Sequence, residues 1–113
     1  MKRKQALAER IAQLEAGENP SQAQWAEVFP DTPDDDGYPR SMMATQANVG
    51  WIDAAKLLHV AVLPRHYAQV HMWPVPEMCR VDIGGGHTGR GDDPARAWLL
   101  AILRALHSME PET

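Results

Sequence analysis

The sequence has little cysteine and no long apolar run. Cys79 is the only cysteine among 113 residues, so no internal disulfide can form and the chain suits a reducing compartment. No apolar stretch approaches the ~18 residues that a membrane-spanning helix requires. The basic start is followed by Glu9 and Glu15, where a signal peptide would be apolar. We therefore expect a cytoplasmic protein that is neither disulfide-scaffolded nor associated with a membrane.

An excess of positive charge is also lacking. Fifteen acidic residues against eleven basic ones give a net charge of -4, which disfavours direct binding to nucleic acid. The length allows one domain and not two, and 44% hydrophobic residues are enough for a core without metal or disulfides. We expect a single globular domain over residues 1–113.

Helical spacing of apolar residues recurs along the chain. Ser21 is an expected N-cap, and Asp93 followed by Pro94 is a strong helix start. The final helix is apolar almost all round, which predicts that it is deeply covered. The predicted helices are 3–16, 22–29, 51–59 and the stretch that begins after Asp93.

Strand-like alternation is present at residues 66–73 and 78–83, which a proline-rich turn joins into an expected antiparallel hairpin. Residues 40–49 fit a short strand and an irregular crossing equally well. The prediction is an α+β fold, a layered sandwich with a small antiparallel β-sheet packed with helices, in the order α-α-(β)-α-β-β-α. The expected core residues are Trp51, Val70, Val81, Ile83, Trp98, Ile102 and Leu106.

A glycine-rich segment at 84–93 separates the second strand from the last helix. Gly84, Gly86 and Gly89 form G-x-G-x-x-G, but too little chain follows for a dinucleotide-binding fold, and Asp92 stands near the helix start where a pyrophosphate would sit. We expect a wide strand-to-helix loop. The alternative hypothesis is a small-ligand or nucleotide-binding domain that uses the Gly84–Gly91 loop.

Signals for metal binding and catalysis are weak. His71 and Cys79 fall on opposite faces of the predicted hairpin, which disfavours a zinc site. Asp82 and His87 are a possible acid/base pair, but no nucleophile or paired-carboxylate spacing supports them. We expect no cofactor, no metal and no enzyme activity.

Charged and aromatic residues are the candidates for contact with a protein partner. Four aspartates lie in a turn-rich acidic loop at 31–39, and tyrosine and arginine are common interface anchors. A homodimer is also compatible with the sequence. The candidate partner-binding residues are Asp31, Asp34, Asp35, Asp36, Tyr38, Tyr67, Arg80 and Asp92.

The order of several segments resembles the small phage ABA-sandwich proteins. The resemblance lies in LAERIAQLEAG, then NPSQAQWAEVF, then a helix opening Trp51-Ile52-Asp53, then a hairpin, then DDPARAWLLAILRAL. It implies a helix, antiparallel sheet and helix in layers, and a phage or prophage accessory protein in a bacterial host. We expect such a protein to act by protein–protein binding. One concrete version is an anti-CRISPR-like inhibitor of a bacterial defence complex that presents carboxylates to a nucleic-acid-binding surface.

Overall fold

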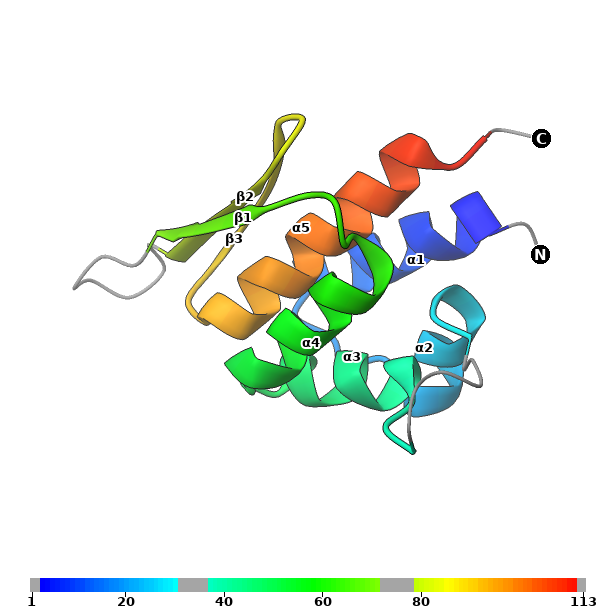
Figure 1. The fold of residues 1–113 in the computed structure, drawn as a ribbon. Coiled ribbons are helices and arrows are strands. Elements are labelled where there is room, and N and C mark those ends of the chain that lie inside the picture. Colours follow the sequence, from blue (N-terminus) through cyan, green and yellow to red (C-terminus); the bar gives the residue numbers. More distant parts are fainter. Residues whose placement is uncertain (1–2, 31–36, 72–78, 112–113) are drawn as a thin grey trace.

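The computed structural model describes residues 3–30, 37–71 and 79–111. Within them the chain forms five helices and a three-stranded antiparallel sheet (Figure 1). The predicted α+β class is therefore confirmed. The elements are α1 (Arg3–Glu15), α2 (Gln22–Val28), α3 (Arg40–Asn48), α4 (Ile52–Val62), β1 (Ala68–His71), β2 (Cys79–Ile83), β3 (His87–Gly91) and α5 (Pro94–Met109).

The helix ends follow the predicted capping residues. The Ser21 side chain accepts from the backbone N–H of Gln24, and the Gln24 side chain accepts from the Ser21 N–H, which completes a capping box. The Asp93 carboxylate accepts from the N–H groups of Ala95 and Arg96. Gly17, with a φ of 78°, follows the end of α1. Within the described ranges, no helix is long and apolar enough to cross a membrane.

The sheet has the order β1-β2-β3, and its first two strands are the predicted hairpin. Val70 pairs with Val81, and Ala68 pairs with Ile83. These four side chains alternate with polar ones, so one face of the sheet is apolar and the other polar.

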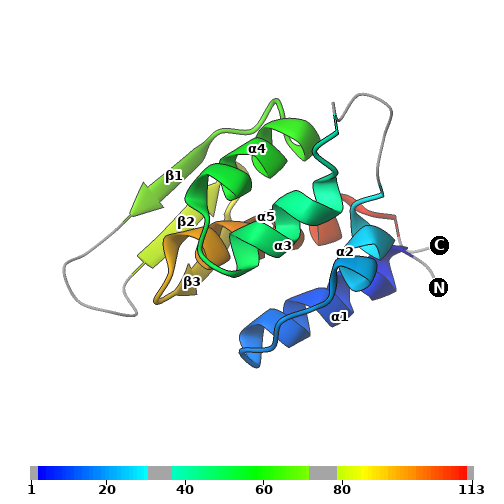
Figure 2. The ribbon, with the colours of Figure 1, turned by 90° about the horizontal axis from the view of Figure 1, so that it is seen from below.

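The last helix, α5, lies between the sheet and the other helices (Figures 1 and 2). It packs on β2 and β3 through one side, and on α1, α3 and α4 through the others. Its predicted deep burial is confirmed, because nine of its residues are buried. Of the predicted core, Val81, Ile83, Ile102 and Leu106 are buried, and Val70 and Trp98 are partly buried against the core.

The prediction that Trp51 belongs to the core was wrong, since its side chain is 60% exposed. Trp51 is the N-cap of α4 and has extended backbone angles, so it does not continue the inward stripe of the helix. That stripe consists of Ala54, Ala55, Leu58 and His59. The core tryptophan is Trp25, which is fully buried and stacks on Phe29 with ring centroids 6.0 Å apart.

Residues 40–49 are neither a strand nor an irregular crossing, because they form α3. Met43, Ala44 and Ala47 are buried at helical spacing. The helix ends before Gly50, whose φ of 108° suits glycine. The four described helices that precede the sheet are therefore consecutive.

The predicted loop at 84–93 contains a strand. Residues 84–86 are the turn, and residues 87–91 pair with β2. Gly89 faces α5 so closely that a Cβ there would lie 1.9 Å from the carbonyl oxygen of Ala97. Glycine in this strand is thus required by the close approach of two backbones.

Candidate functional site

The polar face of the sheet is organised in rows across the three strands. His71, Arg80 and Arg90 are cross-strand neighbours in one row. Asp82 lies in the next row, between Gln69 and Thr88. Among the described elements only α5 packs extensively on the sheet, and it covers the apolar face.

Asp82 is the centre of this polar face. Its Oδ1 accepts a hydrogen bond of 2.9 Å from the Thr88 hydroxyl, and its Oδ2 lies 3.2 Å from both Arg80 Nε and His71 Nε2. Desolvation raises the pKa of Asp82, but the Thr88 hydrogen bond and the charges of Arg80 and His71 together outweigh it. The pKa therefore lies below its ordinary value.

The arrangement around Asp82 differs from that of an activated nucleophile. In a nucleophile–histidine–carboxylate relay the imidazole lies between the other two groups. Here the carboxylate lies between the Thr88 hydroxyl and the His71 imidazole. His87, the sequence candidate for acid/base work with Asp82, pairs with Ile83, whereas Thr88 pairs with Asp82. Strand alternation therefore places His87 on the opposite face from Asp82.

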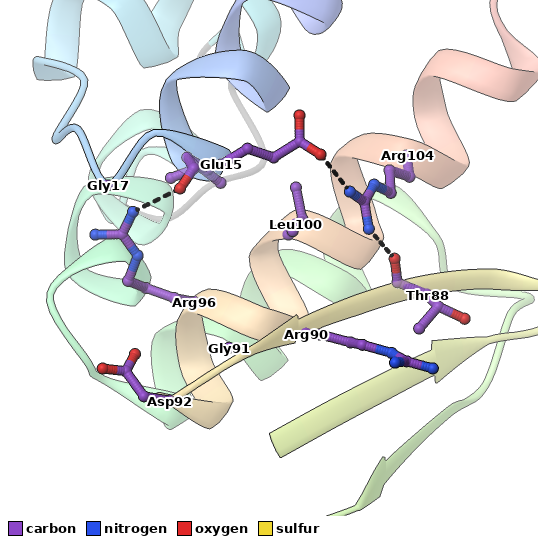
Figure 3. A pocket seen from close by; sticks show the side chains of 10 residues that line it. Glu15, Gly17, Thr88, Arg90, Gly91, Asp92, Arg96, Leu100 and Arg104 are labelled. Carbon is purple, nitrogen blue, oxygen red and sulfur yellow. Dashed lines mark hydrogen bonds and ion pairs between the residues drawn. The ribbon is translucent and has the colours of Figure 1, made fainter. Parts of the chain in front are cut away.

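A cavity of about 740 Å³ lies beyond β3, against the end of α1 and the side of α5 (Figure 3). Arg90, Arg96 and Arg104 line it, so we name it the arginine pocket. Leu14 and Leu100 give it an apolar part. Its volume lies within the range of roughly 300–1,000 Å³ that is usual for small-molecule sites.

Arg96 and Arg104 hold the end of α1 against α5 and β3. Arg96 donates to the carbonyl oxygens of Leu14 and Glu18 at 3.3 Å and to Asn19 Oδ1 at 3.2 Å. Arg104 donates to the Thr88 carbonyl at 2.6 Å, and it forms an ion pair of 2.7 Å with Glu15 (Figure 3). Both guanidinium groups are therefore fixed in place by the fold.

Two other charged residues at the pocket are freer. Arg90 is exposed, and it has no hydrogen bond or ion pair with the described part of the chain. Asp92, a predicted partner-binding residue, is also exposed and lines the same pocket.

An exposed apolar surface lies over α4 and the residues just before it. Seven large hydrophobic side chains among the described residues are exposed, and five of them fall between positions 49 and 60. We name this surface the α4 face; it consists of Val49, Trp51, Ile52, Leu57 and Val60.

The predicted partner-binding residues do not gather in one place. Tyr38 is half-buried against the core, and its hydroxyl donates to Gln46 Oε1. Tyr67 is exposed at the start of the sheet, and Arg80 is held by Asp82. Asp31, Asp34, Asp35 and Asp36 lie outside the described residues. The α4 face was not predicted, because Trp51 was expected in the core and is instead exposed.

The glycine pattern does not form a dinucleotide site. Gly84 and Gly86 belong to the turn of an antiparallel hairpin, whereas the fingerprint requires a turn that leads directly into a helix. His71 and Cys79 lie on opposite faces as expected, because Cys79 packs against the core. In the described ranges no three histidine, cysteine or acidic side chains gather as metal ligands would.

Comparisons with known proteins give no match, so a function can be inferred only from the arrangement of residues in this structure. No family model matches the chain, and neither a curated protein nor a solved structure matches it.

Proposed function

We propose that this protein acts by binding another protein through the α4 face. The observation that carries the proposal is the concentration of five of seven exposed large hydrophobic side chains within residues 49–60. Single exposed apolar residues are normal on a protein surface. A contiguous group of them is typical of an interaction site.

The burial pattern of α4 supports this reading. The inward side of the helix packs Ala54, Ala55 and Leu58 into the core. Its outward side carries Ile52, Leu57 and Val60. The outward side also carries the exposed Asp53 and Lys56, so it mixes apolar and charged side chains, and its three large apolar side chains are exposed among the described residues.

The composition of the α4 face also suits a protein partner. Trp51 is exposed at the helix start, and tryptophan is enriched among the residues that dominate binding energy at interfaces. Asp53 and Lys56 are exposed on the same helix and carry opposite charges. At about 100° per residue these two charges lie between Ile52, Val60 and Leu57 on the outward side of α4, and protein–protein interfaces combine apolar and polar contacts in this way.

The proposal is tested with Leu57→Asp, which places a charge on the α4 face at a side chain that is 46% exposed. The matched control is Tyr67→Asp, which places the same charge at an exposed aromatic position on the sheet side. A partner captured from bacterial lysate by the wild-type protein is purified, and its affinity for each variant is measured. We expect Leu57→Asp to weaken binding by about tenfold or more, as for interface residues that carry much of the binding energy, and Tyr67→Asp to leave it unchanged.

Two results would overturn the proposal. One is equal affinity of the purified partner for wild type and Leu57→Asp. The other is light scattering that shows a dimer which Leu57→Asp converts to monomer, since the α4 face would then bind a second copy of this chain.

A narrower version of the proposal is inhibition of a bacterial defence complex in the cytoplasm of a phage host. It is supported by the resemblance to phage ABA-sandwich proteins and by the acidic residues 31–36. Replacing Asp34, Asp35 and Asp36 with asparagine then weakens binding to the complex and reduces its dependence on salt. Unchanged binding in a pull-down with the purified complex excludes this version.

A further inference from the structure

We infer that the free edge of β3 binds an extended peptide segment of a partner protein, which adds a fourth, antiparallel strand to the sheet over the arginine pocket. β3 is an edge strand, because the sheet has the order β1-β2-β3 and β2 is its only strand neighbour among the described residues. The site is formed by β3, α1 and α5. It is therefore separate from the α4 face and does not depend on the binding proposed there.

Two residues of β3, Thr88 and Arg90, direct their backbone N–H and C=O groups to the free edge. Along an antiparallel strand, residues that exchange hydrogen bonds with one neighbouring strand alternate with residues whose groups point to the other side. The Gly84 N–H donates to the Tyr67 carbonyl, so the even-numbered residues of β2 bond to β1 and the odd-numbered ones to β3. Thr88 and Arg90 pair with even-numbered residues of β2, and their own groups therefore point outward.

One of these outward groups is already used within the fold. The Arg104 guanidinium donates to the Thr88 carbonyl at 2.6 Å, which agrees with its outward direction. For the Thr88 N–H and for both groups of Arg90, the described part of the chain provides no hydrogen-bond partner. An unpaired strand edge is a template for a further strand. In an antiparallel strand, the residue opposite Arg90 would exchange two hydrogen bonds with it, and the Thr88 N–H would donate to a residue two positions along.

The arginine pocket provides the space that a fourth strand needs. It borders β3 from Thr88 to Asp92 and α5 from Arg96 to Arg104. This length of helix spans about 12 Å, and this length of strand spans about 13 Å, so the cavity follows the strand edge. A strand added beside β3 would lie over the cavity, with the end of α1 on its other side (Figure 3).

The two faces of the sheet at this edge determine which peptide would fit. The Arg90 side chain lies on the polar face with that of Arg80, its cross-strand neighbour, so it stands beside the pocket and does not point into it. It is exposed and has no ion pair with the described residues, so an acidic residue opposite would pair with it across the strands. The residues before and after that acidic one would face α5, where Leu14 and Leu100 line the pocket. The fitting segment is therefore an acidic residue between two apolar ones.

The experiment titrates the full-length protein with the peptide acetyl-Thr-Val-Glu-Val-Thr-amide and follows backbone amide NMR shifts and hydrogen exchange. We expect saturable binding, with shifts at Thr88, Gly91 and Leu100 and slower exchange of the Thr88 and Arg90 amides. The same peptide with an N-methylated glutamate lacks the N–H that the Arg90 carbonyl would accept, and should bind about tenfold more weakly. With lysine in place of glutamate, the peptide should bind about fivefold more weakly, because like charges would then be opposite.

A pair of protein variants tests the role of the charge. Arg90→Ala keeps the backbone groups of the edge and should bind the glutamate and lysine peptides equally. Arg65→Ala is the matched control, because it removes an exposed arginine outside the sheet, and it should keep the preference for glutamate.

Three results would overturn the inference. One is the absence of saturable binding of the glutamate peptide to wild type at millimolar concentration, and another is equal binding of its N-methylated form. The third is a dimer whose Thr88 and Arg90 amides are protected without peptide, because β3 of a second copy would then occupy the edge. Failure of the Leu57→Asp test leaves this site unaffected.

Discussion

The indole Nε1–H of Trp98 donates a hydrogen bond of 3.1 Å to His59 Nδ1. Tryptophan is a donor only, so His59 accepts at Nδ1 and carries its proton on Nε2, which faces the carbonyl of His66. His59 is only 5% exposed. One buried imidazole thus joins α4, α5 and the segment that enters the sheet.

Removing either partner of this pair is expected to destabilise the fold. His59→Ala leaves the indole N–H and the His66 carbonyl without their partner, which costs about 1–3 kcal/mol for each buried group. Trp98→Phe removes the donor while keeping an aromatic ring. Urea unfolding of both single variants and the double variant should show a non-additive coupling, and strictly additive losses would contradict the pairing. Gln69→Ala, at an exposed sheet position, is the control.

Gly89→Ala should be among the most damaging single substitutions in the chain. The new Cβ would lie 1.9 Å from the Ala97 carbonyl oxygen and 2.7 Å from the Ala101 nitrogen. Both are backbone atoms of α5, so relief requires the strand and the helix to separate, at a cost of about 3 kcal/mol or more. Gly84→Ala is the matched control, because nothing lies within 4 Å of its Cβ position. Similar thermal midpoints for the two variants would refute the close approach.

Asp82→Asn should reduce stability in a pH-dependent way. The pKa of Asp82 is lowered in the folded state, so its ionised form favours folding above its unfolded pKa of about 3.9. That contribution disappears as the pH falls through the lower, folded value. Urea unfolding should therefore show wild type more stable than Asp82→Asn at pH 6, with the difference shrinking toward pH 3. A difference that stays constant over this range would contradict the interpretation.

Arg96→Gln should loosen the end of α1. The substitution removes the charged donor that contacts the Leu14 and Glu18 carbonyls, which we expect to cost about 1–2 kcal/mol for hydrogen bonds to a charged group. Amide hydrogen exchange should accelerate in the last turn of α1 more than in α4. Arg90→Ala serves as the control and should leave exchange in α1 as in wild type.

The sequence predicted the elements whose signals are local. Helix starts are set by residues that act on backbone groups within three positions, as Ser21, Asp93 and Pro94 do. The alternation of apolar and polar residues around Val81 likewise indicates which side chains of that strand face the core. These signals depend little on the rest of the chain. For this reason the predictions of these helix starts and of the hairpin were confirmed.

The errors have different causes, and only the first of them is long-range. β3 has the composition of a loop because Gly89 must fit against α5, and that packing cannot be seen in the strand itself. Trp51 has the hydrophobicity of a core residue, but its position as N-cap turns it away from the inward stripe. Met43, Ala44 and Ala47 have helical spacing, which favours α3. The prediction of a strand or an irregular crossing for residues 40–49 did not use this spacing.

The arginine pocket was beyond prediction for a similar reason. Arg96 and Arg104 appear in the sequence as two charges on an otherwise apolar helix. Their partners at the end of α1 and in the segment that follows it are 77 to 89 residues away along the chain. A single sequence holds no signal that pairs them, so the clamp and the cavity beside it appear only in three dimensions.

The position of α5 has a consequence for how the protein is made. This helix packs against the sheet, α1, α3 and α4, yet it follows all of them in the chain. Ribosomes add about 5–20 residues per second, so α1, α3 and α4 are made seconds before the helix that covers them, whereas β3 directly precedes it. Until residues 94–109 leave the ribosome, the apolar sides of the sheet and of α1 lack their main partner. We therefore expect the core to be completed only after α5 has been made, when it packs between the sheet and the other helices.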